Sequence, residues 1–306
     1  MIGVRRDTLY RPVDLFAGFD PRSVGSYTRT LDAQTYLDTR RDWTDSAGTQ
    51  RALHDQGITM ARDEFIAGRR VAAVMGGHAE PRGSMTYRAV ASMAHHLAGR
   101  FTVASGGGPG AMEATHLGAL ITDPDEVVAA ISRLAHDCAE FPHNMKHLVG
   151  NGAFDETLVA QLHAWQAPAF DVLEGVDELS RRPSLSIPTW FYGHEPPTPF
   201  ATHIAKYFHN ALREDGLLAI ARAGIVFAPG KAGTLQEVFQ DATQNYYETF
   251  GPASPMAFLD VDGYWSSQFP VEHLLRPLFG AERYARWIMI SADPDEIVEF
   301  IDSGGR

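Results

Sequence analysis

The stretch Phe101-Thr-Val-Ala-Ser-Gly-Gly-Gly-Pro-Gly110 passes from an apolar run directly into a glycine-rich turn, and a helix is expected to follow it from about Gly110 to Leu120. An earlier apolar run, Val71-Ala-Ala-Val-Met75, ends in the same way at Gly76-Gly77 and precedes a helix expected from Ser84 to about Gly99. Short continuous apolar runs are typical of buried parallel strands. Because crossover connections are right-handed, we expect these two strands to be neighbours, with their turns at the carboxyl edge of one sheet.

A second glycine-rich loop, Pro229-Gly-Lys-Ala-Gly-Thr-Leu-Gln-Glu237, follows the apolar run Gly224-Ile-Val-Phe-Ala228 in the same local setting. A glycine turn at the start of a helix presents free backbone N–H groups and the positive end of the helix dipole, which together suit a phosphate group. Thr234 adds a hydroxyl and Glu237 adds a carboxylate. Two such loops in one domain indicate a site for a phosphorylated ligand such as a nucleotide.

The spacing of the glycines narrows the class of ligand. Neither loop ends in the Gly-Lys-Ser/Thr of a P-loop, and neither has the Gly-x-Gly-x-x-Gly spacing of dinucleotide-binding proteins, which disfavours NTP hydrolysis and hydride transfer. Each loop taken alone is also compatible with a purely steric need for glycine. The two loops together favour a mononucleotide or a sugar phosphate.

The rest of the chain continues the alternation of strand and helix patterns, which predicts an α/β fold. We expect a doubly wound, Rossmann-like parallel sheet with helices on both faces in residues 69–306, with a partly helical insertion at 121–184. Residues 1–68 are expected to form a mostly helical N-terminal extension. The further elements expected are strands at 185–190, 255–259 and 287–290, and helices at 125–140, 153–180, from about Ala201 through Arg213, and from the second loop to about Phe250.

Composition excludes several classes of protein. The chain has 306 residues and a formal net charge of −12, which argues against a broad nucleic-acid surface but not against a mononucleotide held by backbone dipoles. No apolar stretch approaches the length of a membrane span, and no signal peptide is apparent, so no membrane partner is expected. The single cysteine, Cys138, rules out an intrachain disulfide and fits a reducing cytoplasm.

Three regions of the sequence resemble the LONELY GUY (LOG) family. Ser105 to Ala114 resembles that family's first glycine motif, and Pro229 to Glu237 resembles its Pro-Gly-Gly-x-Gly-Thr-x-x-Glu signature. Leu259-Asp-Val-Asp-Gly-Tyr264 is similar to its Asn-Val-Asp-Gly-Tyr turn. The resemblance covers roughly residues 69–119 and 204–301. It implies a Rossmann-like homodimer or higher homo-oligomer that hydrolyses the N-glycosidic bond of a nucleoside 5′-monophosphate to free base and ribose 5-phosphate, without a metal or redox cofactor.

The resemblance also implies a catalytic pair. Glu237 matches the motif glutamate, and Arg213 is the best match for an arginine on the preceding helix, although Ala211-Leu-Arg-Glu214 departs from the family's Met-His-Glu-Arg-Lys. Glycosidic cleavage passes through an oxocarbenium-like transition state, so a carboxylate near the ribose can stabilise positive charge or orient water. An arginine can bind phosphate or assist the departing base. The alternative is a surface cation and a carboxylate that complements a helix dipole.

Further residues are candidates for ligand binding. Lys231 replaces the second glycine of the signature, so its backbone must avoid positive φ, and its ammonium could reach a phosphate or point to solvent. Met112 and Glu113 are possible ribose or base contacts, although Glu113 could also complement the dipole of its helix. The backbone groups expected to hold phosphate and ribose belong to Gly106, Gly107, Gly108, Gly110, Gly230, Lys231, Ala232, Gly233 and Thr234.

The aromatic residues Trp190, Phe191 and Tyr192 either stack on a base or pack under a proline-rich loop. The segment Glu140 to Lys146 is expected to be a surface loop, with a mobile lid as the alternative. His194, His203 and His209 lack a recognisable ligand spacing, so no metal site is expected. The hypothesis from the sequence is therefore a cytoplasmic phosphoribohydrolase acting on a purine nucleoside monophosphate such as AMP. The alternative is a non-catalytic nucleotide sensor or carrier on the same fold.

Overall fold

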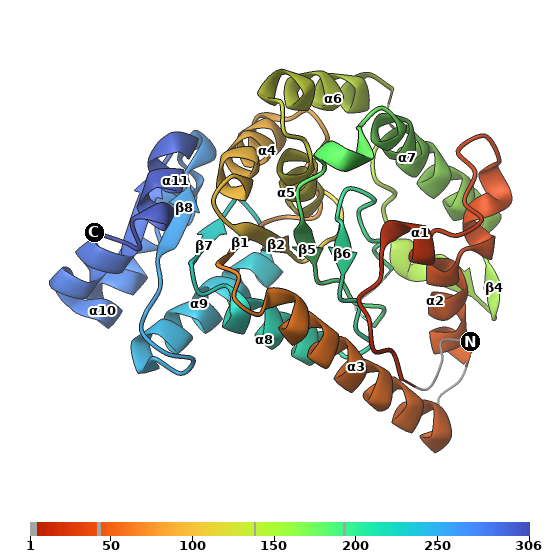
Figure 1. Cartoon of the computed structure of the whole chain (residues 1–306), viewed down its shortest axis with the longest axis horizontal. Helices are drawn as coiled ribbons and strands as arrows, with labels where there is room; N and C mark the ends of the chain where they lie inside the picture. Colours follow the sequence, from red (N-terminus) through yellow and green to blue (C-terminus); the bar gives the residue numbers. More distant parts are fainter. Residues whose placement is uncertain (1–4, 42–43, 138, 192–193) are drawn as a thin grey trace.

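The computed structural model describes residues 5–41, 44–137, 139–191 and 194–306, and its centre is a seven-stranded sheet (Figure 1). The strand order is β6-β5-β2-β1-β7-β8-β9, and every neighbouring pair is parallel. This confirms the expected doubly wound α/β architecture. The strands are β1 (Val71–Met75), β2 (Thr102–Ser105), β5 (Ser184–Ser186), β6 (His203–Ile204), β7 (Gly224–Phe227), β8 (Met256–Leu259) and β9 (Ile288–Ser291).

Helices cover both faces of this sheet (Figure 1). One face carries α4, α5, α6 and α11, and the other carries α3, α8 and α9. The N-terminal helices α1 and α2 lie beside α7. The bounds are α1 (Pro12–Leu15), α2 (Leu31–Arg41), α3 (Asp45–Ile66), α4 (Met85–Ala98), α5 (Ala111–Leu120), α6 (Pro124–Asp137), α7 (Glu156–Glu174), α8 (Asn210–Ile220), α9 (Ala232–Tyr247), α10 (Glu272–Trp287) and α11 (Pro294–Asp302). A two-stranded antiparallel hairpin, β3 (Val149–Gly150) and β4 (Ala153–Phe154), precedes α7.

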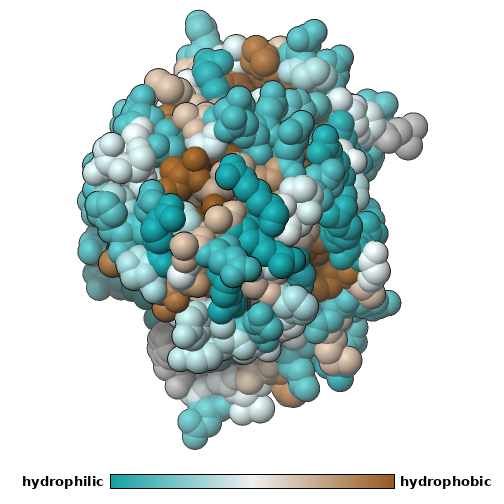
Figure 2. Space-filling view, turned by 90° about the vertical axis from the view of Figure 1, so that its left-hand side faces the viewer, coloured by the Kyte–Doolittle hydropathy of each residue, from teal (hydrophilic) through white to brown (hydrophobic). Residues whose placement is uncertain are grey.

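The central strands separate two hydrophobic cores because successive side chains of a strand point to opposite faces. In β1, Val71, Ala73 and Met75 belong to the core under α3 and α8, whereas Ala72 and Val74 belong to the core under α4 and α5. Burial on both faces explains why β1 and β7 are apolar throughout rather than alternating. The face at the carboxyl-terminal end of the molecule is mostly hydrophilic, with hydrophobic residues in small separate areas (Figure 2). Within the described ranges, no helix combines the length and hydropathy that a bilayer span requires.

Several of the expected elements form where their local signals predict them. The side chain of Ser84 accepts a hydrogen bond from the backbone N–H of Tyr87, which caps the start of α4. Strands β1 and β2 are neighbours, with Val74 opposite Ser105, and β7 pairs with the other edge of β1, with Met75 opposite Phe227. The turns that follow these three strands therefore emerge side by side at the carboxyl edge.

The expected helix from Ala201 is wrong in its first turns. Residues 201–209 are largely extended and contain β6, and α8 begins only at Asn210. The physical reason is a tertiary hydrogen-bond set that competes with the helix. The carboxylate of Asp55, on α3, accepts from the backbone N–H groups of Phe208 (2.9 Å) and His209 (3.0 Å), and β6 pairs with β5. Propensity alone does not report such long-range partners.

The N-terminal segment is part of the main core. Tyr10 forms an antiparallel bridge with Ile204, in which each backbone N–H donates to the other residue's carbonyl at 2.9 and 2.8 Å. Tyr10, Tyr27 and Tyr36 are buried within the core cluster that also contains β1 and β7 residues. Residues expected as an extension therefore complete the hydrophobic core on the α3 side of the sheet.

A buried ion pair joins this segment to the sheet. The Nζ of Lys206 lies 2.5 Å from Oδ1 of Asp32, and both side chains are fully buried. The same Oδ1 accepts from Trp190 Nε1 at 2.8 Å, and Oδ2 accepts from the Tyr27 hydroxyl at 3.2 Å. Burial lowers the pKa of Lys206 while Asp32 acts in the opposite direction. Because a buried charge is costly without partners, this cluster fixes how the N-terminal segment meets residues 190–206.

We expect Lys206→Met to destabilise the protein by about 3–5 kcal/mol, because it leaves the Asp32 carboxylate buried without its counter-ion. The free energy of unfolding from urea denaturation measures this effect. Arg100→Met is the control, since Arg100 pairs with Asp302 at 3.0 Å but is 44% exposed, and its loss is expected to cost less than about 1 kcal/mol. Equal losses in the two variants would contradict the role given to the buried pair.

Candidate functional site

Three glycine turns meet at the carboxyl edge of β2, β1 and β7. The backbone N–H of Gly77 donates to the Pro229 carbonyl at 3.0 Å, and the N–H of Ala111 donates to the Gly77 carbonyl at 3.1 Å. A Cβ on Gly76 would lie 2.7 Å from the Cβ of Ala111 and 3.1 Å from that of Ala228. The turn after β1 is therefore wedged between the two predicted phosphate loops, and only glycine fits there.

The first glycine loop is shaped by its contact with β5. Gly107 has a φ of +73° and Gly110 a φ of +68°, a region that favours glycine. The backbone N–H of Gly107 donates to the Ser105 hydroxyl at 3.0 Å, and a side chain on Gly107 would overlap with the Ser186 hydroxyl. Ser186 Oγ is buried and has no hydrogen-bond partner among the described residues. The sequence analysis did not identify Ser186 as a candidate site residue. Its place at the carboxyl end of β5 could have indicated it, because ligand sites in such sheets lie at that edge.

Arg213 lies directly over this loop. Its Nε donates to the Ile187 carbonyl at 2.9 Å, which orients the guanidinium. A Cβ on Gly106 would overlap with Nη2 of Arg213, so the absence of a side chain at Gly106 is what admits the guanidinium. The Nη1 of Arg213 lies 3.8 Å from Oε1 of Glu237 on α9. The structure thus brings together the two residues that the family resemblance pairs, from separate helices.

The protonation of Glu237 is set by burial. Burial raises the pKa of Glu237 to about 7, the Arg213 guanidinium lowers it, and the carboxylates of Glu214 and Glu195 raise it further. Desolvation disfavours the charged carboxylate more than one partly exposed guanidinium favours it. A carboxyl group that titrates near neutral pH can act as either an acid or a base, which is common at functional sites.

The second glycine loop has a different construction. A Cβ on Gly230 would overlap with the Thr234 hydroxyl, and the Gly230 carbonyl accepts from the Tyr264 hydroxyl. Lys231 has a φ of −112°, so this position does not require glycine and tolerates the substitution in the signature. The side chain of Lys231 is exposed, as are Ala232 and Gly233, while Thr234 is buried. This loop therefore presents its backbone at the open side of the site.

Met112 contacts the first glycine loop, whereas the neighbouring Glu113 is paired with Arg82. The Sδ of Met112 would lie 2.7 Å from a Cβ on Gly106, which places this side chain at the loop. Glu113 is fully buried, and its two carboxylate oxygens each accept from Arg82 at 2.7 Å. The Tyr87 hydroxyl also donates to Glu113, at 2.9 Å. Glu113 therefore orients Arg82, whose Nη1 donates to the Trp165 carbonyl at 2.6 Å.

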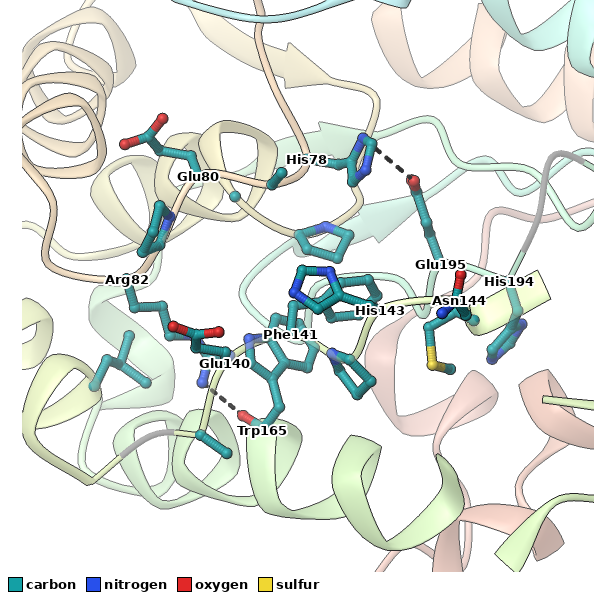
Figure 3. Close-up of a pocket in the computed structure, with 18 of the residues that line it drawn as sticks. His78, Glu80, Arg82, Glu140, Phe141, His143, Asn144, Trp165, His194 and Glu195 are labelled. Carbon is teal, nitrogen blue, oxygen red and sulfur yellow. Dashed lines mark hydrogen bonds and ion pairs between the residues drawn. The ribbon is translucent and has the colours of Figure 1, made fainter. Parts of the chain in front are cut away.

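A pocket of about 480 Å³ continues from the first glycine loop (Figure 3). Pro109 and Gly110 form part of its wall, and Ala139 and the segment Glu140 to Lys146, expected to be a surface loop, form another part. Glu195 lies where the first glycine loop meets the pocket, because its Oε2 would lie 2.7 Å from a Cβ built on Gly108. Its Oε1 lies 3.9 Å from Nδ1 of His78 across the pocket. Sequence reasoning missed Glu195, since a glutamate in a proline-rich loop carries no motif.

Trp190, Phe191 and His209 lie outside this site. Trp190 is buried and bonded to Asp32, and Phe191 packs against Phe208. His209 contacts Asp55. His194 lines the pocket, and its ring also contacts the Tyr27 hydroxyl. Cys138 and Tyr192 lie outside the described residues. In the part of the chain that the structure describes, no group of three or more His, Cys, Asp or Glu residues is arranged to hold a metal ion.

Of three comparisons with known proteins, only the one with solved structures found similar proteins. No protein-family model matches the chain, and no curated protein matches it. Among solved structures, it is similar to the molybdenum cofactor binding protein from the phototrophic bacterium Rippkaea orientalis, with 12% sequence identity and a TM-score of 0.44. The match covers 77% of this chain and 96% of that one.

We expect the Glu237 carboxyl to titrate near pH 7 and Arg213→Gln to raise its pKa further, by roughly one unit, because a nearby positive charge is removed. Carbon-13 NMR of labelled glutamate carboxyls measures this, with Glu237→Gln assigning the signal. Arg222→Gln is the control, since the Arg222 charge acts on Asp241 instead. A Glu237 signal that does not move in Arg213→Gln would show that the guanidinium does not control it.

Proposed function

We propose that this protein hydrolyses the N-glycosidic bond of a purine nucleoside 5′-monophosphate such as AMP, the reaction of the LOG family whose motifs it resembles. One observation carries the proposal. Arg213 and Glu237, from α8 and α9, lie 3.8 Å apart beside Gly106, between two glycine loops that each open a helix. This is the combination of phosphate-binding and charge-stabilising groups that the reaction requires.

The two loops support binding of a ribose 5-phosphate unit. Helices α5 and α9 begin at Ala111 and Ala232, directly after the loops, so the positive ends of their dipoles converge on the same region. Thr234 offers a hydroxyl at the second loop, and Ser186 offers at the first a buried hydroxyl that has no hydrogen-bond partner in the described part of the chain. Binding through backbone groups explains how a chain with a net charge of −12 can hold an anion.

The chemistry follows from the position of the carboxylate. The bond between C1′ and the base nitrogen breaks and a water molecule adds its oxygen to C1′; the proton that this water loses balances the proton that the departing base gains. In the ionised form, Glu237 stabilises the positive charge that develops on the ribose or orients this water. Arg213 binds the phosphate or assists the departing base. The scheme needs no metal or redox cofactor.

A homodimer or higher homo-oligomer is part of this proposal. Helices α8 and α9 expose large apolar side chains, which an interface between two copies of the chain would cover. Leu212 is 51% exposed and Phe239 47% exposed, and Tyr247 at the end of α9 is 72% exposed. Since these helices also carry Arg213 and Glu237, an interface there would lie next to the site.

Incubation of the wild type with AMP is expected to release adenine and ribose 5-phosphate, measured by chromatography, and Glu237→Gln is expected to lower kcat/KM by about 10²–10³-fold. Because Glu237 acts as a carboxylate and burial raises its pKa to about 7, kcat/KM should fall about tenfold for each unit of pH below that value. Intact AMP, GMP and CMP in every sample, together with measurable binding, would instead favour the nucleotide sensor.

Gly106→Ala is expected to weaken binding of ribose 5-phosphate by about tenfold or more, because the new methyl group displaces the Arg213 guanidinium. Isothermal titration calorimetry measures the affinity. Gly48→Ala is the matched control, since a Cβ there meets nothing within 4 Å and Gly48 lies in α3, away from both glycine loops. It is expected to leave affinity unchanged and to stabilise α3 slightly. A similar loss in both variants would contradict the role of Gly106 in admitting Arg213.

A further inference from the structure

The pocket beside the first glycine loop is built mostly by a part of the chain that the family resemblance does not cover. Leu134, Ala135, residues 139–146 and Trp165 belong to the expected insertion at 121–184, and they line the pocket together with Pro109 and Gly110. Figure 3 shows Phe141 and His143 projecting toward the middle of this space from the 139–146 segment. Its volume, about 480 Å³, lies within the range of small-molecule sites.

The first glycine loop connects this pocket to the proposed reaction site. Gly106 lies under the Arg213 guanidinium, and Gly108 lies under the Glu195 carboxylate. Pro109 and Gly110 then form the pocket wall. A ligand with its phosphate and sugar near Arg213 would therefore reach the pocket by following one loop of five residues, past Glu195.

The walls of the pocket suit a flat, polar ring. Phe141 and Trp165 form an edge-to-face pair with ring centroids 4.9 Å apart. The Arg82 guanidinium lies 4.2 Å from the Trp165 ring centroid and is fixed there by its two hydrogen bonds to Glu113. This support holds the aromatic wall in place before any ligand binds. At the other end, Glu195 and His78 face each other and offer hydrogen-bonding groups (Figure 3).

We propose that this pocket is the subsite for the base of the bound nucleotide, a planar nitrogen heterocycle that stacks on Phe141 with its polar edge toward Glu195. The inference rests on the proposed function, because it assumes that ribose 5-phosphate occupies the glycine loops. It assigns the recognition of the base to the insertion rather than to the glycine motifs. The Glu195 carboxylate can accept a hydrogen bond from an amino group or a ring N–H of such a base.

The test compares two ligands that differ only in the base. Affinities for AMP and ribose 5-phosphate are measured by calorimetry in a Glu237→Gln background, where the nucleotide stays intact. Phe141→Ala is expected to weaken AMP binding about fivefold to 150-fold, the range for loss of one base–aromatic stack, and to change ribose 5-phosphate binding less than about twofold. Phe141→Tyr keeps the ring and is expected to restore AMP binding to within about threefold of the background protein.

Phe250→Ala is the matched control, since Phe250 is 48% exposed on the turn after α9 and lies outside the pocket lining. It is expected to change neither affinity. If Phe141→Ala leaves AMP binding unchanged, or weakens both ligands equally, the pocket is not the base subsite, while the proposed function stands. If the background protein binds neither ligand, the proposed function fails and this assignment fails with it.

Discussion

The close packing of three glycine turns is the constraint on which the whole site depends. Gly76 lies against Ala111 and Ala228 at distances that leave no room for a side chain, and backbone hydrogen bonds join Gly77 to both neighbouring loops. Backbones can approach this closely only where side chains are absent. As a result, α5 and α9 start on either side of β1, and the positive ends of both dipoles act on one region. The glycines therefore determine the position of the loops as well as their conformation.

Buried polar groups of the N-terminal segment hold the rest of the site against this centre. Asp32 binds Lys206 and Trp190, which flank the loop that carries Glu195. Asp55 accepts hydrogen bonds from Phe208 and His209, immediately before α8, the helix of Arg213. A buried carboxylate contributes little net stability because its desolvation is costly, but it tolerates very few arrangements of its partners. In this chain, that selectivity fixes where α8 begins.

The sequence allows the centre of the fold to be predicted better than its periphery, for a physical reason. The strands before the glycine loops and the cap at Ser84 depend on short-range patterns, and the structure has them as expected. The extended segment 201–209 depends on Asp55, about 150 positions away, so local propensity predicted a helix there. Glu195 was missed because its role depends on its proximity to Gly108, and no spacing in the sequence indicates that contact.

Charge balance in the site links ligand binding to protonation. Arg213 acts on both Glu237 and Glu195, and burial raises the pKa of each carboxyl. Two ionised carboxylates near one guanidinium would repel a phosphate dianion, so anion binding favours the protonated form of Glu237. Under the proposed reaction, the positive charge that develops on the ribose favours the ionised form instead. Binding and bond cleavage therefore favour opposite protonation states of the same carboxyl group. Arg213, at 3.8 Å, is placed to stabilise its ionised form.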